Sequence, residues 1–179
     1  YEELQFSKFN VINFYERRAR RILPALVFVI LCSIPLSWAL LLMPGDMKDF
    51  SQSVAAVATF SSNFLFWREA GYFSSAAELK PMLHTWSLSI EEQFYVLFPL
   101  LLMCSRRLGG THTIWLLIAL LVLSLVAAVW WVARYPSATF YLLPTRAWEL
   151  LVGAITALCL REMKIALPTW QNNILSLIG

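Results

Sequence analysis

The chain has little charge for its length. Asp, Glu, Lys and Arg make up 14% of its 179 residues, whereas a soluble domain carries about 25%. Apolar residues reach 59%, and the mean hydropathy is +0.65. The formal net charge is only +3, and the basic residues gather at the ends of apolar runs, which argues against a nucleic-acid surface. This composition indicates an integral membrane protein with no nucleic-acid partner.

Cysteine and histidine are scarce, with three and two copies. Cys32, Cys104 and Cys159 are scattered among apolar runs and show no CxxC spacing. An odd, scattered set argues against a disulfide framework and against a zinc site. We therefore expect no metal and no bound cofactor.

The chain opens on Tyr1 with acids ahead of its first apolar run, so we expect no signal peptide with a basic leader. The sequence ends inside a new apolar run that starts at Ile174. We therefore expect it to be a piece of a longer protein.

Four uncharged or nearly uncharged runs approach the length of about 20 residues that a membrane-spanning helix needs. The predicted spans are 22–43, 86–104, 114–133 and 141–160. Residues 50–67 are uncharged but rich in polar side chains, which predicts a re-entrant segment or a polar span inside a bundle. Positive charges flanking the spans fit both options, and the Arg106-Arg107 pair at a span end favours re-entry. The predicted fold class is all-α, a polytopic transmembrane helical bundle.

Four arginines precede the first predicted span, namely Arg17, Arg18, Arg20 and Arg21. They predict a cytoplasmic N-terminal end for this span. This role as an orientation signal needs no further chemistry. Alternatively, two guanidiniums at i and i+3, such as Arg18 and Arg21, can bind phosphates at the membrane surface. The residues alone leave both interpretations open.

The stretch from Pro81 to Tyr95 places two acids, a histidine and several hydroxyls against apolar sequence. On one helix, His84, Ser87, Glu91 and Tyr95 share a face, and Glu92 points about 100° away from Glu91. An ionisable group at membrane depth is usually paired or functional. Glu91 is therefore the stronger candidate for a functional acid, while Glu92 equally suits the headgroup region near a helix N-terminus.

A further pair of charges, Arg146 and Glu149, lies in the predicted span 141–160. At i and i+3 the two side chains can form an ion pair, which lowers the cost of burying them. A structural role is favoured over a site. Three functional classes remain open at this stage: an enzyme, a secondary transporter or channel with Glu91 as the ion-coupling group, and a structural membrane subunit.

Two motifs point to a family. The first is Phe14-Tyr15-x-Arg17-Arg18-x-x-Arg21-Ile22-x-Pro24, and the second is Pro81-x-Leu83-His84-Thr85-Trp86-Ser87-Leu88-Ser89-Ile90-Glu91-Glu92-Gln93-Phe94-Tyr95. Together they resemble the membrane-bound acyltransferase-3 family, the bacterial O-acyltransferases of lipopolysaccharide O-antigen, peptidoglycan and exopolysaccharide. The segments Asn63-Phe64-x-Phe66-Trp67 and Gly71-Tyr72-Phe73 also resemble the family's intervening region.

The resemblance implies a bundle of roughly ten helices in the bacterial inner membrane. Such a protein moves an acyl group, with acetyl expected, from cytoplasmic acyl-CoA to a hydroxyl of an envelope glycan or a lipid-linked saccharide. Membrane lipid is a further expected partner. The implied acyl-CoA end comprises Arg17, Arg18 and Arg21.

Acyl transfer needs a base or a nucleophile, and donors for the developing oxyanion. Within the resemblance, Glu91 is the candidate base or orienting acid, Ser87 and Tyr95 are candidate carriers or donors, and His84 is a candidate base or a structural residue. The family's best-known catalytic histidine lies upstream of the arginine cluster and has no counterpart in this sequence. We therefore expect this piece alone to be inactive.

Overall fold

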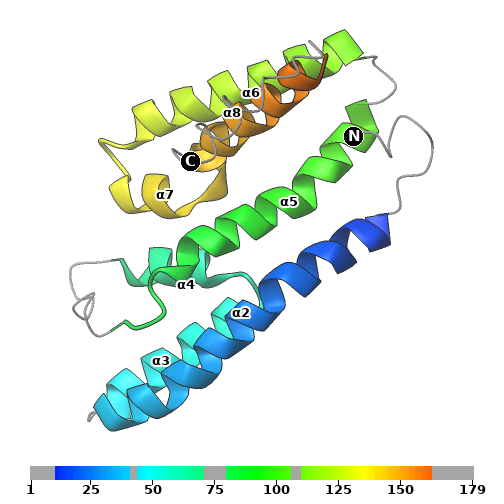
Figure 1. Ribbon diagram of the computed structural model, residues 1–179. Coiled ribbons are helices and arrows are strands. Elements are labelled where there is room, and N and C mark those ends of the chain that lie inside the picture. Colours follow the sequence, from blue (N-terminus) through cyan, green and yellow to red (C-terminus); the bar gives the residue numbers. More distant parts are fainter. Residues whose placement is uncertain (1–10, 41–43, 71–79, 106–109, 163–179) are drawn as a thin grey trace, which may run out of the picture.

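The computed structural model describes residues 11–40, 44–70, 80–105 and 110–162. These residues form helices and no strand, which confirms the all-α fold class (Figure 1). The helices are α2 (Val11–Leu40), α3 (Pro44–Ala58), α4 (Ser62–Glu69), α5 (Thr85–Ser105), α6 (Gly110–Trp131), α7 (Pro136–Tyr141) and α8 (Leu143–Glu162). The end of the first predicted span, the Gly71-Tyr72-Phe73 segment and the Arg106-Arg107 pair lie outside the described residues.

Four stretches of helix are long and apolar enough to cross a membrane. They are Ile12–Leu40, Thr85–Ser105, His112–Trp131 and Pro136–Leu160, and each overlaps one of the predicted spans. The first begins earlier than predicted because α2 continues back through the arginine cluster. Large apolar side chains on these helices face outward, with Trp38 76% and Trp130 77% exposed. Such a surface suits contact with lipid or with further helices.

The polar segment 50–67 is divided between two helices, α3 and α4. With 15 and 8 residues, neither reaches the length of about 20 residues that spans a membrane. The break follows from a Schellman motif at the end of α3: the Ser61 N–H donates to the Ala56 carbonyl, and the Phe60 N–H donates to the Val57 carbonyl. Phe60 takes the left-handed position, with φ of 51°, at a cost of about 1–2 kcal/mol for a residue with a side chain.

The core is divided between two clusters. One contains Leu26, Phe50, Val57, Phe66 and Met82, and the other contains Phe94, Leu102, Leu117 and Leu151. The start of α5 packs against the first cluster through Trp86 and Leu88, and its second half contributes to the other. Helix α5 therefore links the α2–α4 region to the α6–α8 region, and it lies between them in Figure 1.

Small hydroxyl residues join α4 to α5. The Ser62 and Ser89 hydroxyls are 2.7 Å apart, and the Thr85 hydroxyl donates to Ser62 Oγ at 3.1 Å. All three side chains are buried. Small residues let helix backbones approach closely in membrane proteins, so this contact fixes α4 against the start of α5. At the other end of α4, Glu69 forms a largely buried ion pair with Lys80 at 2.7 Å.

Helices α6 and α8 pack along much of their length through apolar side chains. Leu117 of α6 and Leu151 of α8 are 0% and 3% exposed. Ser124 of α6 reaches into the first turn of α8, where its hydroxyl donates to the Pro144 carbonyl and accepts from the Trp148 N–H. These are the two groups that an α-helix would pair with each other, so Ser124 is inserted into the hydrogen bonding of α8.

Candidate functional site

Helices α2 and α5 lie antiparallel, so the two sequence motifs meet. The Tyr15 hydroxyl, near the start of α2, donates to the carbonyl of Val96 in the second half of α5. Further along α2, Arg18 binds Glu92, and Val29 lines the same groove as His84 before the start of α5. Two of these pairs, Tyr15 with Val96 and Arg18 with Glu92, join residues more than 70 positions apart in the sequence.

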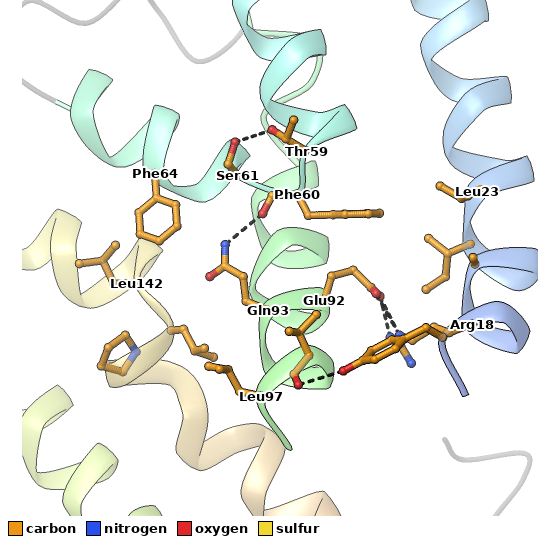
Figure 2. A pocket seen from close by; sticks show the side chains of 16 residues that line it. Arg18, Leu23, Thr59, Phe60, Ser61, Phe64, Glu92, Gln93, Leu97 and Leu142 are labelled. Carbon is orange, nitrogen blue, oxygen red and sulfur yellow. Dashed lines mark hydrogen bonds and ion pairs between the residues drawn. The ribbon is translucent and has the colours of Figure 1, made fainter. Parts of the chain in front are cut away.

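Arg18 and Glu92 form the strongest polar contact between the two helices. The Arg18 Nη2 lies 2.7 Å from Glu92 Oε1, and Nε lies 3.0 Å from both carboxylate oxygens (Figure 2). The side chains are 21% and 12% exposed. The guanidinium carbon also lies 3.3 Å from the centre of the Tyr95 ring. Two-point hydrogen bonding and stacking on an aromatic ring together give Arg18 a fixed orientation.

A groove of about 450 Å³ lies beside this contact. We call it the polar groove because charged, imidazole and hydroxyl side chains make up half of its lining, the other half being apolar. It is lined by four predicted site residues: Arg21 from α2, and His84, Ser87 and Glu91 from the start of α5. The three residues from the second motif therefore share a face, as their spacing predicts. Tyr95 does not line the groove, because its ring lies against Arg18.

The charged side chains that line the polar groove are accessible to a ligand. Glu91 and Arg21 are exposed, and neither forms an ion pair within the part of the chain that the structure describes. The Ser87 hydroxyl donates to the His84 carbonyl at 3.3 Å. Arg17 is exposed on α2 and lines neither this groove nor the neighbouring cavity. The groove thus offers a carboxylate, an imidazole, a hydroxyl and a guanidinium to a ligand.

An apolar cavity of about 780 Å³ also lies beside the α2–α5 contact (Figure 2). Ile22 lines both the groove and the cavity, whereas Leu23 of α2 and Leu97 of α5 line only the cavity. The remaining walls come from the α3–α4 turn and the start of α8. The Arg18–Glu92 pair lines one side of this cavity.

An amide network that the sequence did not reveal supports the cavity wall. The Gln93 Nε2 donates to the Phe60 carbonyl at 3.0 Å and to Asn63 Oδ1 at 2.8 Å. The Asn63 Nδ2 in turn donates to the Tyr141 carbonyl at 3.1 Å, and Asn63 is fully buried. The network therefore holds α5, the α3–α4 turn and the end of α7 together.

The predicted pair of Arg146 and Glu149 is confirmed at 2.8 Å. The Arg146 guanidinium lies 5.0 Å from the Trp86 ring centre and 5.5 Å from the Phe140 ring centre. The pair lines neither the groove nor the cavity. Its contacts join α8 to α5 and α7, which supports the structural interpretation.

Four membrane-length helices define a multi-pass membrane protein of the all-helical class. The comparison with protein families refines this class. The family described as "Acyltransferase domain" matches residues 4–177. The chain belongs to this acyltransferase family, which confirms the resemblance carried by the two motifs.

Individual relatives agree with the family. The chain is 29% identical over 185 residues to an uncharacterized protein of Haemophilus influenzae, with 99% of this chain and 75% of the relative covered. It is 30% identical over 160 residues to O-acetyltransferase OatA of Staphylococcus aureus, with 87% of this chain and 26% of the relative covered. It is 29% identical over 175 residues to peptidoglycan O-acetyltransferase OatA of Listeria monocytogenes, with 93% and 28% covered. No solved structure matches the chain.

Proposed function

We propose that the protein is a membrane O-acyltransferase of the bacterial inner membrane. It transfers an acyl group, with acetyl as the simplest case, from cytoplasmic acyl-CoA to a hydroxyl of a cell-envelope carbohydrate. Membership of the acyltransferase family supports the reaction class. The names of the relatives support an O-linked acetyl product, and the Listeria name favours peptidoglycan over lipopolysaccharide O-antigen as the acceptor.

The observation that carries this proposal is the meeting of the two motifs in one groove. Arg21 comes from the first motif, and His84, Ser87 and Glu91 come from the second. An exposed guanidinium beside an exposed carboxylate suits a reaction in which an anionic donor meets a hydroxyl acceptor. Among the arginines, Arg21 is the better candidate for the CoA phosphates, because Glu92 already holds Arg18.

The groove can supply the groups that acyl transfer requires. Glu91, or alternatively His84, takes the proton of the acceptor hydroxyl as its oxygen attacks the thioester carbonyl. A new C–O bond forms, the C–S bond breaks, and CoA leaves as the thiol after receiving the proton. Ser87 can instead carry the acyl group between donor and acceptor. Glu92 neutralises Arg18, and Arg17 lines neither the groove nor the cavity, so Arg21 is the arginine placed to bind the donor.

The test measures labelled acetyl groups on envelope glycan in cells that make the complete protein at matched membrane levels. We expect Glu91→Gln to lower the transfer about 100-fold or more, since general-base catalysis contributes about 10²–10⁴-fold. We expect Arg21→Ala to raise the acyl-CoA concentration needed for half-maximal transfer in membrane vesicles. Glu149→Gln is the matched control, because this acid lies outside the groove.

Wild-type transfer in the Glu91→Gln variant would remove Glu91 from the reaction and leave His84 as the base. No transfer by the wild-type protein from any acyl-CoA would contradict the proposed function. In that case ion flux in vesicles would test Glu91 as a coupling group of a transporter.

A further inference from the structure

The apolar cavity beside the Arg18–Glu92 pair is larger than an acetyl group requires. We propose that this cavity is a subsite for the hydrocarbon chain of a longer acyl-CoA donor, and that Phe60 is the wall that sets the length of chain accepted. The inference rests on the proposed function, because the chain belongs to the donor of that reaction.

The lining of the cavity fits an uncharged chain. Its volume of about 780 Å³ lies within the range of roughly 300–1,000 Å³ that holds small-molecule ligands in proteins. Most of the lining is apolar, including Leu23, Phe64 and Leu97. Arg18 and Glu92 are the charged residues in the lining, and they neutralise each other. Burial of a further charge here would be unfavourable, whereas burial of methylene groups is favourable.

The polar groove offers the opposite chemistry to the rest of the donor. Arg21 and His84 line the groove, and both suit the phosphates and polar arm of CoA. Ile22 lines the groove and the cavity alike. In the proposed arrangement the thioester lies beside Ile22, the chain occupies the apolar cavity, and the CoA portion lies along the groove that Glu91 also lines.

The Phe60 side chain is held in a defined position in the wall of the cavity. A phenylalanine at φ of 51° occupies a backbone position that glycine adopts without strain. The Phe60 carbonyl is held by Gln93 Nε2. Figure 2 shows the Phe60 side chain reaching from the α3–α4 turn toward Leu23 of α2. The ring also packs against the buried cluster that contains Leu26 and Val57, so packing holds the strained residue at a fixed place in the cavity wall.

The first test locates the chain directly. Membranes with the complete protein are irradiated with octanoyl-CoA that carries a photoreactive diazirine on its chain, and labelled peptides are mapped by mass spectrometry. We expect labels on the half-buried cavity residues Ile22 and Leu143, with loss of label when unmodified octanoyl-CoA is added but not when octanoyl phospholipid is added. Labels confined to outward residues such as Val129 and Trp130, or competed by phospholipid, would overturn the subsite in favour of bilayer lipid.

The second test changes the wall. Phe60→Gly and Phe60→Ala both remove the ring, but only glycine relieves the backbone strain. If the ring sets chain length, both variants shift the ratio of dodecanoyl to octanoyl labelling upward by about tenfold or more, the effect of a few methylene groups in an apolar pocket. Trp115→Ala, an exposed aromatic on α6 outside the cavity, leaves the ratio unchanged. An unchanged ratio in both Phe60 variants would overturn the role of Phe60.

The two proposals fail separately. Cavity labelling without any transfer to glycan would refute the proposed function and keep the subsite. Transfer of acetyl groups without labelling of the cavity would refute the subsite and keep the function.

Discussion

Two helix pairs of this protein are held together by different kinds of contact. Helices α6 and α8 pack through apolar side chains such as Leu117 and Leu151, and polar contact between them centres on Ser124. Helices α2 and α5 are bridged by long polar side chains, with Arg18 on Glu92 and Tyr15 on the Val96 carbonyl. A groove and a cavity flank this second contact.

We infer from this difference that the α6–α8 pair mainly provides stability, whereas the α2–α5 pair mainly serves function. Lipid tails are as apolar as leucine, so helices in a membrane associate through close packing and not through removal of apolar surface from water. The α6–α8 pair meets this requirement. The α2–α5 pair gives up close packing and keeps charged groups beside apolar sequence, a costly arrangement that we interpret as a functional region.

The largest loss of unfolding free energy is expected for a substitution between α6 and α8. Leu117→Ala leaves a cavity between α6 and α8, and we expect a loss of unfolding free energy of about 2–4 kcal/mol. Acetyl transfer per folded molecule is expected to stay at the wild-type level. The measurements are thermal unfolding of the complete protein in detergent and transfer normalised to folded protein. A specific loss of transfer at full stability would show that α6 and α8 are not merely structural.

A slightly smaller effect is expected when the polar bridge is broken. Glu92→Ala leaves the partly buried Arg18 charge without its carboxylate, which costs about 3 kcal/mol, the lower end of the range for broken buried pairs. Arg18→Met in the same chain removes the stranded charge and is expected to restore much of the loss. Equal destabilisation in the single and double variants would show that the two charges are not coupled. The exposed Arg20–Glu16 pair provides the control, since Glu16→Ala costs less than about 1 kcal/mol.

The smallest effect is expected at Ser124. Ser124→Ala removes the hydroxyl between the Pro144 carbonyl and the Trp148 N–H. These two groups can then bond to each other within α8, so the loss of unfolding free energy is expected to be about 1 kcal/mol or less. Hydrogen exchange at the Trp148 amide measures whether the bond forms. Rapid exchange together with a loss above about 2 kcal/mol would show that Ser124 is required to satisfy α8.

Local spacing explains what could be predicted from the sequence. The shared face of His84, Ser87 and Glu91 and the pairing of Arg146 with Glu149 both follow from helical periodicity. Apolar run lengths likewise predict the four membrane-length helices. Each of these features depends only on residues within a few turns of one another.

Contacts between distant residues could not be predicted in this way. The spacing correctly turns Glu92 away from Glu91, but no local rule joins it to Arg18, 74 positions earlier. The Gln93–Asn63 contact, 30 positions apart, has the same character. The helix break at Phe60 escaped prediction for another reason: a phenylalanine occupies the position where glycine usually signals the end of a helix.

The ion pair between Lys80 and Glu69 limits how far a change in the length of the connection between α4 and α5 can disturb the fold. The two residues are eleven positions apart in the sequence, and the hydroxyl contact at the other end of α4 also joins this helix to α5. Because side-chain contacts hold α4 to the start of α5, the length of the chain between these two helices does not affect the position of the groove. Doubling a loop adds only about 0.6 kcal/mol of closure entropy. We therefore expect a short insertion between α4 and α5 to leave the groove unchanged.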